Sequence, residues 1–370
     1  MILILTQCFP PDIGGIENLM GGLADNLHRA GREVVVLADR IRNGKTAKNF
    51  AYPVFRFDGP RPLRRWLKYR KTKAIAESSA IEAVFTDSWK SVSAVPDLDA
   101  PIIVLAHGTE LPSEPRTHKI QRIKRALSRA ATIVPNSVYT AGRLREYTDE
   151  KARIEVIHPP IELPDKADTQ NLSFLNIADD APVLLTLARL EPRKGIDKVI
   201  ASMPELREVF PNIVYLIGGG GEDRTRLESL ALNSGVMYSV RFLGPITSAD
   251  MKCALYERAD LFVMPSRQIG NSIESFGISY IEAAWFGVPS VAGKDGGAGE
   301  AVQHGETGLV CDGSDQASVT HAIATLLKDD ALRVKLGDAA ARRVREELQW
   351  SQAIKRYLAL IDDHAMERAG

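Results

Sequence analysis

Two carboxylates, Glu274 and Glu282, stand eight positions apart on either side of Gly277, where an apolar stretch of helical length begins. At 3.6 residues per turn this spacing is about 2.2 turns, so it predicts both acids near one helix face, with Glu274 at the N-terminal end. Backbone N–H groups at a helix start attract anions, and we expect those of Ser275, Phe276 and Gly277 to serve a phosphate or a sugar. Carboxylates that accept from hydroxyls beside such a cradle indicate a nucleotide-sugar site.

An alternative interpretation is that the two acids lie on a solvated helix face, because charged pairs at helical spacing usually do. The neighbouring residues favour burial, since they make the helix apolar on most sides: Ile278, Ile281, Ala283, Ala284, Trp285 and Phe286. Buried carboxylates need partners, which favours a binding role for both acids.

Two cations follow an apolar strand in the second half of the chain. Arg189 comes just after the strand, and Lys194 comes five residues later, before the next helix. An arginine binds a diphosphate bidentately and a lysine acts as a point charge, so this pair predicts a diphosphate site that needs no metal. A solvated basic turn is the alternative.

Paired glycines follow a strand in each half of the chain, Gly14-Gly15 in the first and Gly218-Gly219 in the second. Glycine lets a backbone approach a bound group closely, although many such glycines serve only a turn. His107, at the end of another apolar strand, is either structural or part of a site at the carboxyl edge of the sheet.

The pattern of elements predicts an α/β protein with two doubly wound parallel sheets. Apolar strands without polar alternation, each followed by a helix, need a sheet covered on both faces. We expect strands at 2–6, 33–38, 54–57, 83–86, 102–106, 132–135 and 155–157, then at 182–188, 213–217, 240–242, 261–263, 290–292 and 309–311. A proline-rich linker at 159–168 suggests domains at 1–165 and 166–350, with a final helix in 351–370 that returns to the first domain. The active site is expected where the carboxyl ends of the two sets of strands face each other.

The charge of the 370-residue chain is uneven, although its formal net charge is zero. Residues 1–165 hold 25 Lys and Arg against 19 Asp and Glu, and residues 61–73 combine seven of these cations with Leu63, Trp66, Leu67 and Tyr69. A basic stretch with Trp and Leu suits an anionic membrane surface, a soluble anionic acceptor or plain solvation. Three widely spaced cysteines and the absence of an apolar run of ~20 residues predict a cytoplasmic protein. The basic stretch would allow it to associate peripherally with the inner face of the cytoplasmic membrane.

These motifs together, in this order, resemble the retaining nucleotide-sugar glycosyltransferases of family four, also called glycosyl transferases group 1. The likeness covers nearly the whole chain and extends to the late turns Gly296–Glu300 and Gly305–Leu309. It implies the GT-B fold, two Rossmann-like domains that face a central cleft, with the donor bound mainly by the second domain and the acceptor mainly by the first.

The resemblance also implies roles for individual residues. Arg189 and Lys194 would bind the diphosphate, Glu282 the ribose, Glu274 the transferred hexose, and the amides near Phe276 and Gly277 the sugar or phosphate. His107 would line the sugar site, and Gly15 would approach the phosphate from the other domain. No metal and no cofactor are implied.

The same resemblance implies a retaining transfer by front-face attack, with Glu274 as a covalent nucleophile as the competing mechanism. The nucleobase of the donor would lie near Ile246. Guanine has N–H donors that would favour a carboxylate beside it, and the nearest carboxylate in the sequence is Asp250, four residues on. We therefore expect a UDP-sugar rather than a GDP-sugar. Lipid, polysaccharide and small-molecule acceptors stay open. The alternatives are a sugar-nucleotide 2-epimerase of the same fold, a nucleotide-dependent oxidoreductase and a non-catalytic sugar-nucleotide binder. An oxidoreductase would need a Gly-x-Gly-x-x-Gly turn. Gly14-Gly15 does not supply that spacing, and in the second half Asp223 stands where the third glycine would fall.

Overall fold

The computed structural model describes the chain except for residues 13, 42–48, 113–115, 165–171 and 370, and it divides into two compact units. Unit 1 comprises residues 1–160 and 350–370, and unit 2 comprises residues 161–349. The boundary predicted between residues 165 and 166 lies outside the described residues. None of the described helices is long and apolar enough to cross a bilayer.

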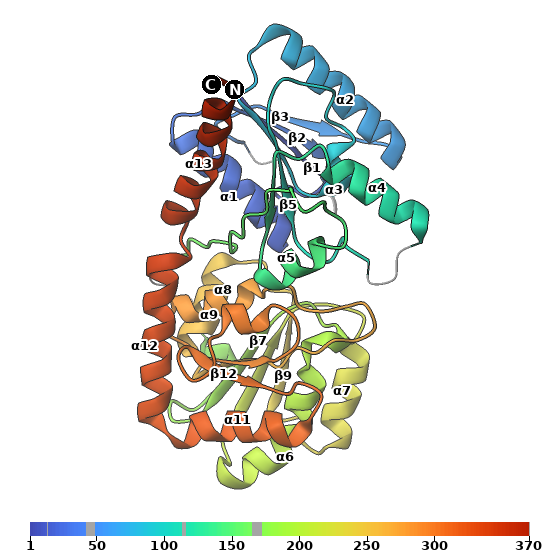
Figure 1. Cartoon of the computed structure of the whole chain (residues 1–370). Coiled ribbons are helices and arrows are strands. Elements are labelled where there is room, and N and C mark those ends of the chain that lie inside the picture. The colour runs from blue at the N-terminus through green and yellow to red at the C-terminus, as the bar shows by residue number, and fades with distance from the viewer. Residues whose placement is uncertain (13, 42–48, 113–115, 165–171, 370) are drawn as a thin grey trace. The chain divides into compact units, whose positions relative to one another are not determined.

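Unit 1 is built on a parallel six-stranded sheet in the order β3-β2-β1-β4-β5-β6 (Figure 1). Its strands are β1 Ile2–Thr6, β2 Val34–Asp39, β3 Val54–Phe57, β4 Ala83–Thr86, β5 Ile102–Ala106 and β6 Thr132–Pro135. Its helices are α1 Gly15–Arg29, α2 Arg61–Ser78, α3 Trp89–Val92, α4 Thr117–Leu127, α5 Val138–Leu144 and α13 Trp350–Ala369. The order places β1 beside β4, so the chain runs outward in both directions from this pair.

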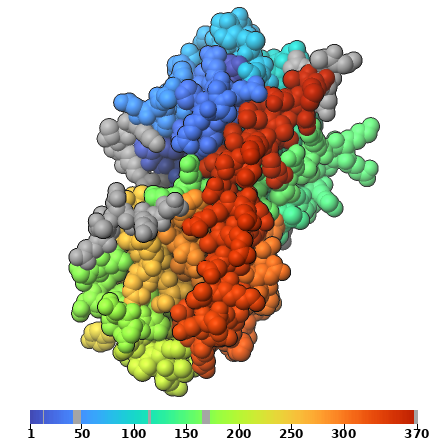
Figure 2. Space-filling model, turned by 90° about the vertical axis from the view of Figure 1, so that its left-hand side faces the viewer, coloured from blue at the N-terminus to red at the C-terminus, as the bar shows by residue number. Residues whose placement is uncertain are grey.

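The strands of unit 1 bury both faces because alternate side chains enter different cores. Ile2 and Ile4 pack in a core with α1 and α13, whereas Leu3 and Leu5 pack in a core with α3 and α4. α13 therefore covers the same face of the sheet as α1, and the two helices lie side by side in Figures 1 and 2.

Unit 2 repeats this plan with a parallel sheet in the order β12-β11-β10-β7-β8-β9. Its strands are β7 Val183–Leu187, β8 Val214–Gly218, β9 Val240–Gly244, β10 Leu261–Met264, β11 Ser290–Gly293 and β12 Gly308–Cys311. Its α-helices are α6 Ile196–Val209, α7 Arg224–Asn233, α8 Ala249–Arg258, α9 Ile278–Trp285, α10 Ala298–Ala301, α11 Gln316–Lys328 and α12 Asp330–Glu347, with 3₁₀ turns η1 Ser173–Leu175 and η2 Pro192–Lys194. α6, α7 and α11 pack on one face of the sheet, and α8, α9 and α12 pack on the other.

The predicted α/β class and two parallel sheets are confirmed, and all but one of the expected strands form within two residues of their predicted ends. The exception is the strand expected at 155–157, which was wrong. This segment runs beside β6, where the N–H of Glu155 donates to Ile133, that of Ile157 donates to Pro135, and Ile133 donates to Arg153. Among the described residues these bonds form an isolated bridge at Ile154 and no seventh strand.

Candidate functional site

A buried ion cluster surrounds Glu274 in unit 2. Oε2 of Glu274 accepts hydrogen bonds from Arg193 Nη1, at 2.7 Å, and from Lys194 Nζ. The Glu274 side chain is only 12% exposed, and both cations are as deeply buried. Both cations bind Oε2, and Oε1 has no hydrogen bond within the described part of the chain. Oε1 can therefore accept a hydrogen bond from a ligand hydroxyl.

The cations keep Glu274 ionised in spite of its burial. Burial is the largest influence on this carboxyl and by itself would raise its pKa, but the combined attraction of Lys194 and Arg193 outweighs it and lowers the pKa from 4.5 to about 2. Burial lowers the pKa of the Lys194 ammonium, and Glu274 opposes that shift. Glu274 therefore acts as a hydrogen-bond acceptor and cannot serve as a general acid near neutral pH.

Two glycines fix the backbone that carries Glu274. The N–H of Gly297 donates to the carbonyl of Glu274 at 2.9 Å, and a Cβ on Gly297 would come within 1.9 Å of the carbonyl oxygen of Ser275. Gly296 has a φ of 75°, and a Cβ there would lie 2.2 Å from the carbonyl oxygen of Glu274. The turn after β11 can therefore approach the Glu274 segment only with glycine at both positions.

Lys194 is held by a similar close approach. It ends the 3₁₀ turn η2, and Gly195 follows it with a φ of 73°. A Cβ on Gly195 would lie 2.1 Å from the carbonyl oxygen of Pro265, which comes just after β10. The glycine thus lets η2 pack against the end of the neighbouring strand and directs Lys194 toward Glu274.

Arg189 lies differently from Lys194. Its side chain is 73% exposed, and Nη1 is 2.7 Å from Oε1 of Glu191, whose other oxygen accepts from Arg193 Nε at 2.9 Å. Glu191 therefore links the exposed guanidinium of Arg189 to the buried cluster. The structure brings Arg189, Lys194 and Glu274 into one chain of ion pairs, with Arg189 at its solvent end, so the diphosphate role of Arg189 stays a prediction.

The predicted glycine turn after β8 positions the exit of β7, from which Arg189 follows. Gly219 has a φ of 145°, and a Cβ there would lie 1.8 Å from the carbonyl oxygen of Ala188. Gly218 ends β8, and its hydrogen faces the side chains of Leu187 and Ile246. Ile246 is half-buried and packs on the apolar core, so the structure brings this predicted residue beside the same turn.

Glu282 has its own partners. Its Oε1 is 2.5 Å from Lys252 Nζ on α8, and its Oε2 accepts from the Tyr256 hydroxyl at 3.0 Å. Burial, with Glu282 next in importance, raises the pKa of Tyr256 well above its usual value, so the phenol stays protonated and donates. These two contacts fix the Glu282 carboxyl group against α8.

The expectation that both acids share one helix face was wrong. α9 begins at Ile278, so Glu274 precedes the helix by four residues, and Gly277 stands between them in a left-handed conformation with a φ of 97°. A side chain at Gly277 would collide with the Tyr280 ring, which packs directly on this glycine. Tyr280 is held there because its hydroxyl donates to the carbonyl of Met264, at 2.5 Å. The eight-residue spacing therefore places the acids in two separate polar clusters.

The segment between the acids is largely buried. The Phe276 ring lies in the apolar core, and Ser275 Oγ is buried without a hydrogen-bond partner among the described residues. A buried hydroxyl without a partner is unfavourable, which makes Ser275 a candidate ligand donor. The role predicted for the amides of Ser275, Phe276 and Gly277 stays a prediction.

In unit 1, His107 follows β5 and is buried. Its N–H donates to Oε1 of Glu110 at 2.8 Å, while its Nε2 and Oε2 of Glu110 have no partner within the described residues. Two buried polar atoms in one turn indicate a place where a ligand would complete the hydrogen bonding. Gly14 caps α1 and Gly15 is its first residue, where a backbone can approach a bound group.

Three residues of these clusters were not predicted from the sequence: Arg193, Lys252 and Tyr256. Arg193 stands beside the predicted Lys194, and the need of a buried carboxylate for more than one partner was the available signal. Lys252 and Tyr256 lie one turn apart on α8, but nothing local connects that helix to Glu282. No group of three or more His, Cys, Asp or Glu among the described residues is arranged to hold a metal ion.

Family comparisons agree with this architecture. The family described as "Glycosyl transferases group 1" matches residues 168–343, and "Glycosyltransferase Family 4" matches residues 13–164. The chain therefore belongs to the group 1, family 4 glycosyltransferases and is a glycosyltransferase. The family resemblance and the GT-B class predicted from the sequence are confirmed.

Individual relatives cover almost the whole chain. A "GDP-mannose-dependent alpha-(1-6)-phosphatidylinositol monomannoside mannosyltransferase" of Mycobacterium tuberculosis is 30% identical over 94% of both chains. A monoacylated-acceptor counterpart from Corynebacterium glutamicum is 31% identical, covering 95% of this chain and 94% of its own. Sucrose-phosphate synthase from Thermosynechococcus elongatus superposes with a TM-score of 0.82 over both full chains at 21% identity, which shows the fold alone. The expected preference for UDP over GDP finds no support in the names of the two mannosyltransferases.

Proposed function

We propose that this enzyme transfers a mannosyl group from GDP-mannose to a lipid-linked, phosphate-containing acceptor, with retention of configuration and without a metal ion. The observation that carries the proposal is the similarity to mannosyltransferases so described, at 30% identity over 94% of each chain. A likeness of this extent includes unit 1, where the fold would bind the acceptor, as well as unit 2. GDP-mannose replaces the UDP-sugar that the sequence favoured.

The ion cluster of unit 2 supports the donor chemistry. In this proposal Lys194 and Arg189 bind the diphosphate and stabilise the charge that develops on it as the glycosidic bond breaks. Arg193 stays on Oε2 of Glu274 and keeps the carboxylate ionised when Lys194 turns to the phosphate. Oε1 then accepts from a hydroxyl of the sugar, and Glu282 accepts from the ribose.

The low pKa of Glu274 also bears on the mechanism. A carboxylate whose pKa is about 2 is a weak base and a weak nucleophile, so it favours hydroxyl binding over a covalent intermediate. We therefore keep front-face attack, in which the leaving phosphate oxygen takes the acceptor proton. Trapping of a glycosyl adduct on Glu274 would contradict it, as would a β-linked product in an NMR assay of anomeric configuration.

The donor is tested by thermal shift with GDP, UDP and ADP. A nucleotide at a hundred times its dissociation constant stabilises the protein by about 2.7 kcal/mol, so the preferred base gives the largest shift at equal concentration. We expect GDP to give it. A larger shift with UDP would restore the original expectation, and release of GDP from GDP-mannose only when a phosphatidylinositol mannoside is present would separate a transferase from a 2-epimerase or a binder.

A further inference from the structure

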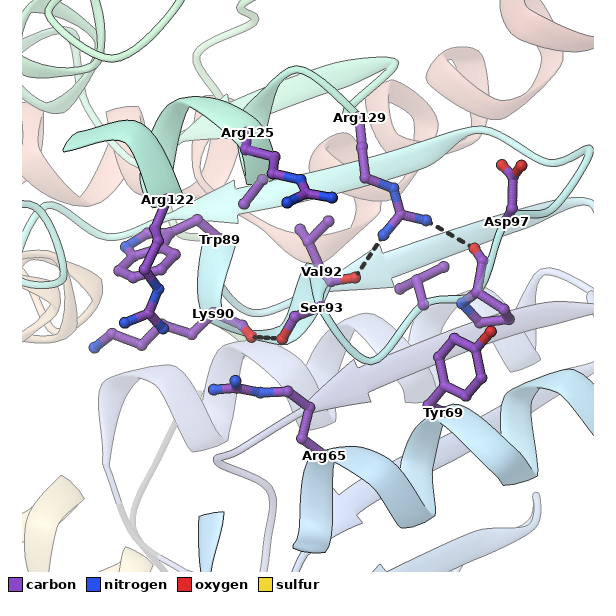
Figure 3. Close-up of a pocket in the computed structure, with 13 residues that line it drawn as sticks. Arg65, Tyr69, Trp89, Lys90, Val92, Ser93, Asp97, Arg122, Arg125 and Arg129 are labelled. Carbon is purple, nitrogen blue, oxygen red and sulfur yellow. Dashed lines mark hydrogen bonds between the residues drawn. The ribbon is translucent and has the colours of Figure 1, made fainter. Parts of the chain in front are cut away.

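Unit 1 contains a basic cavity bounded by α2, α3 and α4. It has a volume of about 600 Å³, and Figure 3 shows Arg65, Trp89, Lys90, Arg122 and Arg125 around it. A second cavity of about 340 Å³ shares four of these residues, Arg65, Trp89, Lys90 and Arg122, so the two are continuous. We call them together the basic cavity.

The basic cavity lies where an open α/β sheet binds ligands. Gln7, which follows β1, lines it, and so does Trp89, which comes shortly after β4. β1 and β4 are neighbours at the point where the strand order reverses, with β2 and β3 on one side and β5 and β6 on the other. Crevices at the carboxyl ends of strands at this position are the usual ligand sites of such sheets.

Six cations of the basic cavity have no acidic partner among the described residues: Arg61, Arg65, Lys90, Lys119, Arg122 and Arg125. Asp97 is a second acid in the lining, beside Asp39, and most of the remaining charges are engaged. Asp39 is paired with Lys68 at 2.7 Å and with Arg64 at 3.1 Å, and Arg129 donates to the carbonyls of Val92 and Pro96, as Figure 3 shows. Excess positive charge at a concave site attracts an anion, and guanidinium groups match phosphate in geometry.

The walls of the basic cavity are held in place. Lys68 is buried one turn after Arg65 on α2, and its Nζ donates to the carbonyl of Thr6 at 2.6 Å as well as pairing with Asp39. This contact attaches α2 to the ends of β1 and β2 and so fixes Arg65. Trp89 donates from its indole N–H to the carbonyl of Glu110, and Lys90 and Arg122 lie about 6 Å from its ring.

The exposed apolar residues of α2 distinguish a lipid from a free phosphate. Leu63, Trp66 and Tyr69 are exposed at spacings of three residues, with Tyr69 in the lining of the basic cavity and Trp66 half exposed, and Arg70 lies over the Trp66 ring at 5.0 Å. Exposed Leu, Trp and Tyr among basic residues suit the interface of an anionic bilayer. A soluble phosphate would have no use for this apolar stripe beside its site.

We propose that the basic cavity binds the phosphate of an anionic phospholipid headgroup, and that this is how the glycosyl acceptor is recognised in unit 1. Only the statement that the bound lipid is the glycosyl acceptor rests on the proposed function, since the lipid phosphate binds whether or not a sugar is transferred. Arg65, Lys90, Arg122 and Arg125 hold the phosphate, Trp89 contacts the headgroup ring, and Leu63, Trp66 and Tyr69 contact the bilayer.

The test is cosedimentation of the full-length protein, without nucleotide, with vesicles of phosphatidylcholine alone or containing phosphatidylinositol. An R65A/R122A variant is compared with K124A/K151A, which removes the same charge from exposed positions of unit 1 outside the basic cavity. We expect the cavity variant to bind phosphatidylinositol vesicles at least about tenfold more weakly, as the loss of charge-assisted hydrogen bonds requires, and the control to stay within twofold of the unchanged protein. An equal loss in the control, or equal binding to both kinds of vesicle, would overturn the proposal.

Competition identifies the source of the phosphate. Soluble inositol 1-phosphate should displace the protein from vesicles only at high concentration, because it lacks the bilayer contacts, whereas equal competition by inorganic phosphate would overturn the lipid assignment. K90E, at an exposed position, is the second variant should the double variant lose its thermal transition. A GDP thermal shift that persists in these variants shows that the donor site is intact. Vesicle binding without turnover would then refute the proposed function alone. An unchanged KM for the acceptor in R65A/R122A would refute acceptor binding by the basic cavity alone.

Discussion

Arg193 and Glu274 form a buried ion pair, with 2.7 Å between Nη1 and Oε2, although 81 residues separate them in the sequence. Lys194 binds the same oxygen, so one carboxylate balances two buried cations. The cluster joins η2, which follows β7, to the segment after β10, and these strands are neighbours in the sheet. Removing either side of the cluster therefore has consequences for both stability and donor binding.

Glu274→Gln should destabilise unit 2 by about 3 kcal/mol, because removal of one partner leaves two buried cations without a counter-charge. Urea unfolding followed by intrinsic fluorescence measures the change. Glu228→Gln is the matched control, since Glu228 pairs with Arg224 at the surface and should change stability by less than about 1 kcal/mol. An equal effect of the two substitutions would show that the Glu274 pairs contribute nothing beyond surface pairs.

Acid should remove the contribution of Glu274. Because its pKa is about 2 in the folded protein and 4.5 in the unfolded chain, the unfolded state binds the proton first, and the stabilisation is complete above about pH 5 and lost as the pH falls toward 2. The difference in unfolding free energy between the native protein and Glu274→Gln should shrink across this window. A constant difference would place the pKa of Glu274 at its ordinary value.

Arg189→Ala should lower kcat/KM by roughly a hundredfold, by analogy with the loss of one donor to a developing negative charge. Its side chain is mostly exposed, so the urea midpoint should not move. Steady-state release of GDP measures the first effect. Normal turnover would show that Arg189 does not bind the diphosphate, whereas a large drop in stability would contradict the exposed position of its side chain.

Glu282→Gln should raise the KM for the nucleotide sugar about tenfold, because an amide accepts more weakly than a carboxylate from ribose hydroxyls. Tyr256→Phe is informative beside it, since it removes one hydrogen bond to Glu282 and leaves the charge. We expect a smaller rise in KM for the phenylalanine variant. Identical kinetics in both variants and the native enzyme would assign Glu282 a structural role only.

EDTA should leave the transfer rate unchanged, because the charge on the departing diphosphate is met by Arg189 and Lys194 in the proposed mechanism. The assay compares dialysed enzyme with and without chelator at saturating substrate. A tenfold loss that Mg²⁺ or Mn²⁺ restores would contradict the absence of a metal from the reaction.

The parallel sheets were predictable because their signal is local. Strands such as Leu3–Leu5 and Leu261–Met264 are continuously apolar, as is typical of buried parallel strands. The segment at 155–157 has a charged residue, Glu155, beside two apolar ones, and next to β6 the structure has an isolated bridge at Ile154 in place of a strand. Short apolar runs do not reveal whether a partner strand is available.

The sequence by itself determined the family, the two α/β halves and the identities of Glu274, Glu282, Lys194 and His107 as residues to examine, since each follows a strand or precedes a helix in a recognisable motif. Only the tertiary structure decided their partners. Arg193 meets Glu274 because the segments after β7 and β10 start from neighbouring strands, and Lys252 meets Glu282 because α8 and α9 pack on the same face of the sheet. Arg65 and Arg122 line one cavity from two different helices, α2 and α4. Pairing across loops depends on the order of strands in the sheet, and that order is a property of the folded chain.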